Sequence, residues 1–259
     1  MDQQISERVA REKDQHDEDG VLESSFALKG KFPHIMISPT MQRCDSDENE
    51  LYKNVEGKCI LDLGCGFGDK SVLMAKHGAI VFGIDISENY ISISKASAVE
   101  ANLEDKCVFQ EMDAHAMVFE DNKFDFVVGR GIIHHLDLPV SLSEIKRVLK
   151  PGGHAMFVEP LGANPLLKIF RLMTPSARTV DERPLDIKDL KWIRNNFEVH
   201  STYYGLLAAP IAMITSLVLR PFPNNPLLRL ADYGERILNK VKWLQPFNQY
   251  VLLNLKKKD

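Results

Sequence analysis

The feature that most constrains this chain is an apolar run at residues 59–63 that leads directly into three glycines at alternate positions. These glycines are Gly64, Gly66 and Gly68. The turn from a strand into a helix needs backbone angles that other residues resist, and a side chain there would hold a nucleoside away from the backbone. The sequence therefore predicts that this loop is the seat of a nucleoside-containing cofactor.

A second apolar run, residues 80–84, ends in the carboxylate of Asp85. A carboxylate accepts hydrogen bonds from both hydroxyls of a ribose, so we expect Asp85 to hold the sugar of the cofactor. Two alternatives stay open. Asp85 would instead cap a helix that begins at Ser87, or the loop would serve a nicotinamide or flavin cofactor, although those folds typically carry Gly-x-Gly-x-x-Gly rather than the Gly-x-Gly-x-Gly found here.

Apolar runs alternate with amphipathic stretches over residues 58–160. This alternation is typical of an α/β fold in which helices pack on a parallel sheet. We expect strands at residues 59–63, 80–84, 107–111, 124–129, 154–158, 197–204 and 249–255, and helices at residues 70–77, 87–101 and 140–148. The segment Lys150-Pro-Gly-Gly153 should end the third helix, because proline cannot continue it and glycine tolerates the turn.

The length of 259 residues is enough to bury one sizeable core. We expect a helical cap or lid at residues 1–50 and a main domain at residues 51–259, with insertions at residues 160–190 and 205–246. The net charge of −4 gives no overall positive field that would attract nucleic acid. The four cysteines lack the paired spacing of zinc sites, so we predict neither a metal nor a disulfide.

Residues 205–219 carry no charge, contain Pro210 and are followed by Arg220. A membrane-spanning helix needs roughly 20 apolar residues. We therefore expect a buried or interfacial helix, with peripheral contact with a membrane surface as the alternative. Residues 1–20 are densely charged and lack the apolar core of a secretion signal, which predicts a cytoplasmic protein.

Six markers occur in order along residues 50–160: Asp62-Leu-Gly-Cys-Gly-Phe-Gly68, Asp85, Met112-Asp-Ala114, Phe124-Asp125, His134-His135 and Lys150-Pro-Gly-Gly153. With these markers the chain resembles the class I S-adenosylmethionine-dependent methyltransferases. The resemblance implies a Rossmann-like α/β fold with a seven-stranded sheet, whose last strand is antiparallel and lies between the fifth and sixth strands. It also implies S-adenosylmethionine as the cofactor.

The resemblance further assigns the cofactor contacts. The glycine loop would face the methionine portion and the sugar, Asp85 would take the ribose hydroxyls, and Asp113 would meet the adenine amino group. Ile86 and Ala114 would sandwich the adenine ring. The implied cofactor-binding set is Asp62, Gly64, Gly66, Gly68, Asp85, Ile86, Asp113, Ala114 and Arg130. The alternative for Asp113 is a helix cap before residues 114–117.

The segments that follow the fourth and fifth strands should face the methyl acceptor, because ligands bind at the carboxyl ends of parallel strands. His134 and His135 are the candidate catalytic residues, since imidazole titrates near neutrality and would take a proton from a nucleophile. The alternative is that the two histidines only tie loops together.

The candidate acceptor-binding residues are Glu159, Asn164, Arg171, Arg178 and Tyr203. The guanidinium groups of the two arginines suit a diphosphate or carboxylate head group. Alternatively, they form salt bridges with Asp181 and Glu182 within the loop.

The connection between the sixth and seventh strands should emerge at the cofactor edge of the sheet. Its many apolar residues predict a hydrophobic small-molecule acceptor, with plain packing of the core as the alternative. Residues 159–185 look like a subgroup that includes carbon methyltransferases of isoprenoid substrates. Aromatic faces such as Tyr203 and Tyr204 would stabilise a carbocation formed from an alkene. The rival hypotheses are methylation of a membrane quinone or lipid, and a non-catalytic protein that binds the cofactor.

Overall fold

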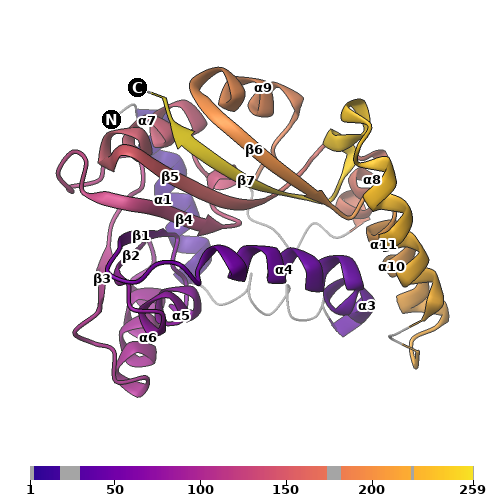
Figure 1. Cartoon of the computed structure of the whole chain (residues 1–259), viewed down its shortest axis with the longest axis horizontal. Coiled ribbons are helices and arrows are strands. Elements are labelled where there is room, and N and C mark those ends of the chain that lie inside the picture. Colours follow the sequence, from indigo (N-terminus) through magenta and orange to yellow (C-terminus); the bar gives the residue numbers. More distant parts are fainter. Residues whose placement is uncertain (1–2, 18–29, 174–181, 223–224, 259) are drawn as a thin grey trace.

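One seven-stranded sheet organises the chain, in the order β3-β2-β1-β4-β5-β7-β6 (Figure 1). The computed structural model describes residues 3–17, 30–173, 182–222 and 225–258. The strands are β1 Cys59–Leu63, β2 Ile80–Asp85, β3 Cys107–Glu111, β4 Phe124–Arg130, β5 Leu149–Pro160, β6 Phe197–Tyr204 and β7 Tyr250–Lys257. Strand β7 pairs antiparallel with both β5 and β6, and the other pairings are parallel. The predicted α/β sheet, with its last strand antiparallel between the fifth and sixth, is confirmed.

Helices cover both faces of the sheet because neighbouring residues of a strand point to opposite sides. Ile60 of β1 packs into a core with α5 Asp69–Lys76 and α6 Glu88–Glu100. Leu61 and Leu63 pack into a second core with α7 Leu138–Val148 and α9 Ile187–Asn196. In Figure 1 the first pair of helices lies below the sheet and the second pair above it. Near-continuous apolar strands are therefore buried on both sides.

The segment Lys150-Pro-Gly-Gly153 differs from the expectation in one respect. Helix α7 ends at Val148, before the segment, as predicted. However, β5 already begins at Leu149, which pairs with Phe124, and the register with β4 then shifts so that Phe126 pairs with His154. The extra residues are accommodated as an irregularity in the strand, and Gly152 takes a φ of 71° there.

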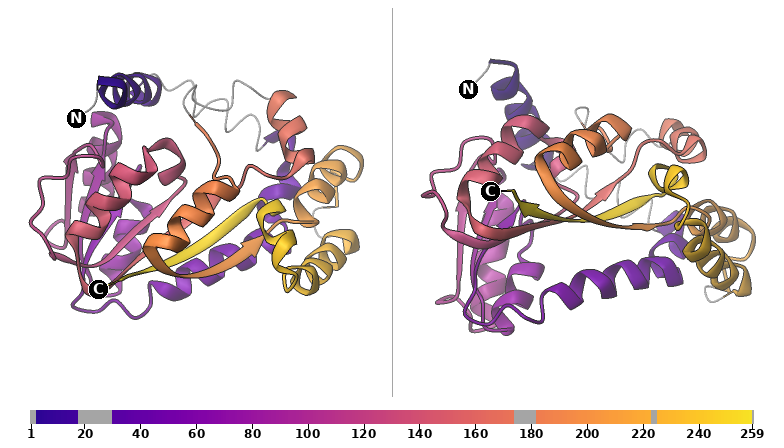
Figure 2. Two further views of the ribbon diagram at one scale, coloured as in Figure 1. Left: turned by 90° about the horizontal axis from the view of Figure 1, so that it is seen from above. Right: turned by 45° about the horizontal axis from the view of Figure 1, so that its top comes forward.

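The remaining helices gather at two separate places, and one of them, residues 39–51, also packs on the sheet through Met41 and Cys44 (Figure 2). Helix α1 Gln3–Asp17 lies at one end of the molecule. At the other end, α10 Ala208–Val218 and α11 Pro226–Leu238 pack on α3 Pro33–Ile37 and α4 Pro39–Leu51. Helix α8 Pro165–Met173 and the short 3-10 helices η1 Ile133–His135 and η3 Lys242–Phe247 complete the described elements. The predicted division into a cap at residues 1–50 and a main domain stays a prediction.

Most of the uncharged segment 205–219 forms α10, which buries small residues such as Ala208, Ala209 and Ala212 and exposes Ile214, Leu217 and Val218. Among the described helices, none combines the length and the apolar character needed to cross a bilayer. The four cysteines are free thiols.

Candidate active site

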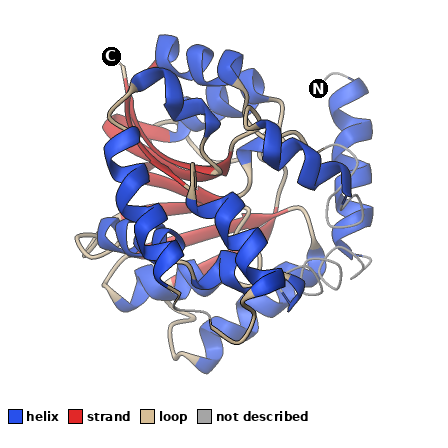
Figure 3. Cartoon of the chain, turned by 90° about the vertical axis from the view of Figure 1, so that its right-hand side faces the viewer, coloured by secondary structure: helices blue, strands red, loops and turns tan. Residues whose placement is uncertain are grey.

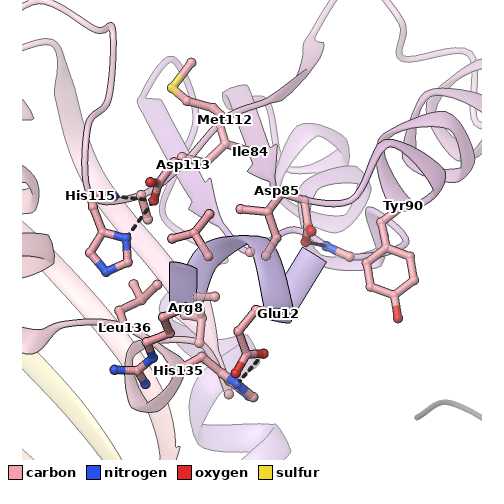
Figure 4. Close-up of a pocket in the computed structure, with 17 residues that line it drawn as sticks. Arg8, Glu12, Ile84, Asp85, Tyr90, Met112, Asp113, His115, His135 and Leu136 are labelled. Carbon is pink, nitrogen blue, oxygen red and sulfur yellow. Dashed lines mark hydrogen bonds and ion pairs between the residues drawn. The ribbon is translucent and has the colours of Figure 1, made fainter. Parts of the chain in front are cut away.

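A cavity of about 160 Å³ lies at the carboxyl ends of β1, β2 and β3 (Figure 4). Seven predicted site residues line it: Gly64, Gly66, Asp85, Ile86, Asp113, Ala114 and His135. This is the edge where parallel α/β sheets bind ligands. The structure therefore brings together most of the predicted cofactor set and one of the two candidate bases.

The glycine loop has the backbone that the sequence predicts. Gly64, Gly66 and Gly68 have φ values of 66°, 52° and 81°, in the left-handed region that side chains disfavour. A Cβ on Gly66 would meet no heavy atom within 4 Å, so the backbone there is bare toward the cavity. A Cβ on Gly64 would instead strike Ile132 at 2.7 Å. Gly66 thus keeps the cavity floor open, and Gly64 permits close packing beneath it.

Asp85 lies at the end of β2 with its carboxylate facing the loop (Figure 4). One oxygen accepts a hydrogen bond from the Gly66 N–H at 3.0 Å, and the other accepts from the Ser87 N–H at 3.0 Å. Ser87 is itself the N-cap of α6, because its hydroxyl accepts a hydrogen bond from the Tyr90 N–H. The capping role is therefore filled by Ser87. A carboxylate at this position has the acceptor chemistry that suits a diol.

Asp113 follows β3 and is held by His115, whose backbone N–H and ring Nδ1 lie 2.8 and 2.7 Å from one carboxylate oxygen. Burial raises the pKa of Asp113, but the hydrogen bonds from His115 outweigh it and leave the pKa below its usual value. Residues 114–117 form a turn and no helix, so Asp113 is not a helix cap. A charged acceptor is thus fixed beside Ala114 at the cavity wall.

The two candidate bases have different surroundings. His135 lines the cavity, and its Nδ1 lies 3.2 Å from a carboxylate oxygen of Glu12 on α1. His134 is not among the lining residues; its Nδ1 lies 2.6 Å from the buried Glu159 and its Nε2 lies 3.8 Å from Glu182. We therefore regard His135 as the candidate base and His134 as a residue that positions the loop after β4.

The ligand atoms of His134, His135 and Glu182 lie within 4.8 Å of one another, which is a spacing that could hold a metal ion. The predicted absence of a metal stays a prediction.

Three predicted cofactor residues lie away from the cavity wall. Asp62 is buried beneath the loop, where it accepts a hydrogen bond from the Ser71 hydroxyl at 2.6 Å. Gly68 packs against α6, where a Cβ would meet Ser94 at 2.8 Å. Arg130 forms ion pairs with Asp45 and Glu48 on α4 at 2.7 and 2.6 Å. Burial lowers the pKa of Arg130, but these carboxylates outweigh it and hold the pKa above its usual value. These three residues therefore contact the elements that carry the cavity wall and do not form the wall themselves.

The predicted acceptor-binding residues are also engaged elsewhere. Glu159 is fully buried and accepts hydrogen bonds from the backbone N–H groups of Ile132 and Ile133. Asn164 directly precedes α8, accepts a hydrogen bond from the Leu166 N–H and donates to the Phe247 carbonyl, and Arg171 donates to the Leu161 carbonyl. Tyr203 is buried and accepts a hydrogen bond from Arg194. Arg178 and Asp181 lie outside the described residues. None of these four described side chains lines the cavity.

Tyr204 is likewise fully buried, and its hydroxyl donates to Asp47 on α4. The aromatic faces expected to stabilise a carbocation are therefore not at the cavity. The connection between β6 and β7 does leave at the cofactor edge, since Tyr204, Tyr250 and Pro160 share one register position. No described residue from 205–249 lines the cavity, however, because α10 and α11 pack on α3 and α4.

Residues of α1 form a wall of the cavity that the sequence did not assign to the site. These are Arg8, Val9 and Glu12. The sequence did not assign three further lining residues, Tyr90, His115 and Leu136. His115 and Leu136 directly follow predicted positions, and Tyr90 lies in the helix after Asp85 and Ile86. The proximity of His115 to Asp113 could have been found from their spacing of two. No local signal in residues 3–17 indicates where that helix docks.

Residues 61–157 match the methyltransferase domain family. The sheet order and the glycine loop beside Asp85 agree with the class I S-adenosylmethionine-dependent methyltransferases that the sequence resembles, and the family match covers the part of the chain that carries these features.

The chain is 37% identical over 122 residues to a demethylmenaquinone methyltransferase from Staphylococcus aureus, covering 46% of this chain and 48% of that protein. It is 34% identical over 104 residues to a ubiquinone biosynthesis O-methyltransferase from Coxiella burnetii, covering 40% and 44% of the two chains. The chain thus spans about half the length of these relatives.

A structure of geranyl diphosphate C-methyltransferase from Streptomyces coelicolor is similar in fold, with a TM-score of 0.59 and 15% identity. The similarity covers 84% of this chain and 81% of that one.

Proposed function

We propose that this protein transfers the methyl group of S-adenosylmethionine to a hydrophobic small molecule. The observation that carries the proposal is the cavity in which the bare backbone at Gly66, the carboxylate of Asp85 and the carboxylate of Asp113 face one space. Those groups match a ligand with a slim chain, a diol and an amine.

The residues present fit the cofactor, and each has a defined task. Asp85 would bind the ribose hydroxyls, Asp113 and the Ala114 backbone would bind the adenine, and Arg8 supplies a positive charge that suits a carboxylate. When bound, S-adenosylmethionine supplies an activated methyl group with a neutral leaving group. The protein then contributes mainly alignment of the acceptor and exclusion of water.

The hydrophobic character of the acceptor is supported by the side chains that line the cavity near His135. Val9, Ile132 and Leu136 present apolar surface there. Among hydrophobic acceptors, a quinone or an isoprenoid is favoured, because the relatives in sequence are named for quinone methylation and one structural neighbour for methylation of geranyl diphosphate. Methylation of a membrane quinone or lipid is therefore the second candidate. A cytoplasmic location stays a prediction.

The direct test is turnover of S-adenosylmethionine labelled in its methyl group, incubated with demethylated quinones, isoprenyl diphosphates and a total lipid extract. Methylated product in one of these pools supports the proposal. Tight binding of the cofactor with no product in any pool would favour the rival hypothesis of a non-catalytic protein.

Asp85→Ala should weaken binding of S-adenosylmethionine by about 1 to 3 kcal/mol, because it removes a charged acceptor from two hydroxyl donors. Titration calorimetry with the donor and with its demethylated form measures this loss. Asp105→Ala, which changes an exposed aspartate outside the cavity, is the matched control and should leave affinity unchanged. Unaltered affinity in Asp85→Ala would refute the ribose assignment.

His135→Gln should lower the turnover rate about 100-fold if the acceptor is a hydroxyl, because the imidazole would no longer take its proton. Donor affinity should change less than about twofold, since a glutamine keeps hydrogen-bonding capacity at the cavity wall. Steady-state kinetics and calorimetry separate the two effects. A full rate in the variant would exclude His135 as the base.

A further inference from the structure

Helix α11 reverses the usual arrangement of a surface helix. Its stripe facing the protein includes Asp232 and Glu235, which are 5% and 0% exposed. Its exposed side includes four large apolar side chains, Leu227, Leu230, Tyr233 and Ile237, beside the cations Arg229 and Arg236. A water-exposed helix normally places its charges outward and its leucines inward. The exposed side of α11 is therefore built for contact with something other than water.

The neighbouring elements also expose large apolar side chains. Figure 3 turns this side of the molecule toward the viewer. Helix α10 exposes Ile214, Leu217 and Val218, at the spacing of one helix face, and Phe222 follows in the turn. Helix α8 is joined to α3 through contact of the Phe170 and Phe32 rings, whose centroids are 5.2 Å apart. The exposed apolar side chains of α8 are Leu166, Ile169 and Leu172. We call the exposed side chains of α8, α10, α11 and their flanking turns the docking face.

The charge around the docking face has one sign. In the described residues 30–44, 161–173, 205–222 and 225–249, the only carboxylates are those of Asp232 and Glu235, and both are buried. The exposed cations in the same ranges are Lys31, Lys168, Arg220, Arg229, Arg236, Lys240 and Lys242. The chain as a whole has more acidic than basic residues, 36 against 32, so this segregation runs against its composition.

The docking face lies at the same edge of the sheet as the cavity. Helix α8 follows the carboxyl end of β5, and α10 follows the carboxyl end of β6. Those two strand ends share a register position through Tyr250 of β7. A surface bound to the docking face would thus lie on the side of the molecule where the cofactor loops end.

We infer that the docking face binds the surface of an anionic lipid bilayer. The apolar side chains enter the boundary between head groups and acyl chains, and the lysines and arginines contact the lipid phosphates. A second copy of this chain fits less well, because a symmetric contact would place cations against cations. The inference does not rest on the proposed function, since it follows from the surface alone.

The test is sedimentation of the full chain with vesicles of phosphatidylcholine that contain about one-quarter phosphatidylglycerol. We expect binding at least about tenfold tighter than to vesicles of pure phosphatidylcholine, with the difference lost at high salt. The readout involves no turnover, so it can fail or succeed independently of methyl transfer.

Leu217→Gln combined with Leu230→Gln should weaken vesicle binding about 100-fold, because two inserted leucines are lost. Val99→Gln combined with Val118→Gln is the matched control; these valines are 58% and 75% exposed and lie outside the docking face. Arg229→Gln combined with Lys240→Gln should weaken binding to the anionic vesicles about twentyfold. The four leucine and cation positions are exposed, and circular dichroism should show that each variant keeps the wild-type fold.

Absence of wild-type binding to the anionic vesicles would overturn the inference. Equal losses in the leucine and valine variants would also overturn it. A third result would overturn it as well: the wild type forms a dimer in sedimentation velocity, the leucine variant is a monomer, and neither binds vesicles. The docking face would then be the contact between two copies of this chain.

Discussion

Replacing Glu235 with alanine is expected to lower the free energy of unfolding by about 3 to 5 kcal/mol. The Glu235 carboxylate is fully buried and accepts hydrogen bonds from the N–H groups of Gly205, Leu207 and Ala208 at 3.1 to 3.3 Å. It thereby takes the place of a cap for α10, whose own N-cap residue, Leu207, has no side-chain acceptor. Alanine would leave these backbone donors buried without their acceptor.

Glu235→Ala should also weaken the packing of α4 against α11. Glu235 also accepts from the Thr40 hydroxyl at 3.0 Å and pairs with Arg43 at 3.2 Å. Arg43 keeps a second partner in Asp232, 3.0 Å away, so the guanidinium is not left wholly uncompensated. This remaining pair limits the loss to the range given above.

Urea unfolding followed by circular dichroism measures the change, with Glu104→Ala as the control. Glu104 is exposed, and its removal should alter stability by less than about 0.5 kcal/mol. The loss of stability in Glu235→Gln should lie between those of Glu235→Ala and Glu104→Ala, because an amide keeps one acceptor oxygen but loses the charge that pairs with Arg43. A loss below about 1 kcal/mol in Glu235→Ala would show that water replaces the carboxylate.

The second large effect is a dependence of stability on pH that arises from Asp62. Burial raises the pKa of this carboxyl from 3.8 to about 6, partly opposed by the hydrogen bond from Ser71. The folded protein therefore holds a proton on Asp62 at pH values where the unfolded chain has released it. Stability from this group is fully present below the unfolded pKa and is lost as the pH rises through the folded pKa, by about 3 kcal/mol in total.

Asp62→Asn removes this titration while keeping an acceptor for the Ser71 hydroxyl. The difference in unfolding free energy between wild type and variant should shift by about 3 kcal/mol in favour of the variant between about pH 3 and about pH 7. Denaturant titrations of both proteins over that range give the difference directly, with the other titrating groups cancelling. A difference that does not change with pH would place the Asp62 pKa near its ordinary value.

The parts of the site that were predictable from sequence depend on local geometry. The glycine loop, Asp85 and Asp113 each follow a strand at a short, fixed spacing, so the backbone carries them to the cavity without help from distant residues. The sheet order was predictable for a related reason, since the resemblance rests on the markers at the ends of these strands.

The parts that were not predictable depend on which residues, distant in the sequence, contact a given side chain in the folded protein. Arg130 ends β4, as expected, but its guanidinium forms ion pairs with Asp45 and Glu48 of α4. Tyr203 lies one residue before the end of β6, but its hydroxyl accepts a hydrogen bond from Arg194 of α9. Strand position fixes where a residue lies along the sheet, whereas the packing of α4, α9 and α1 decides what it contacts.

Helix α1 contacts the cavity directly, so its docking and the binding of a ligand in the cavity depend on each other. Arg8, Val9 and Glu12 form part of the wall, and α1 is tied to the strand ends by an ion pair between Lys13 and Glu111 and a hydrogen bond from Ser87 to Asp17. An occupant that touches this wall binds the protein more tightly when α1 is docked. By reciprocity the occupant holds the helix in place with the same free energy, so cleavage of residues 3–17 by a protease should slow as the cavity fills.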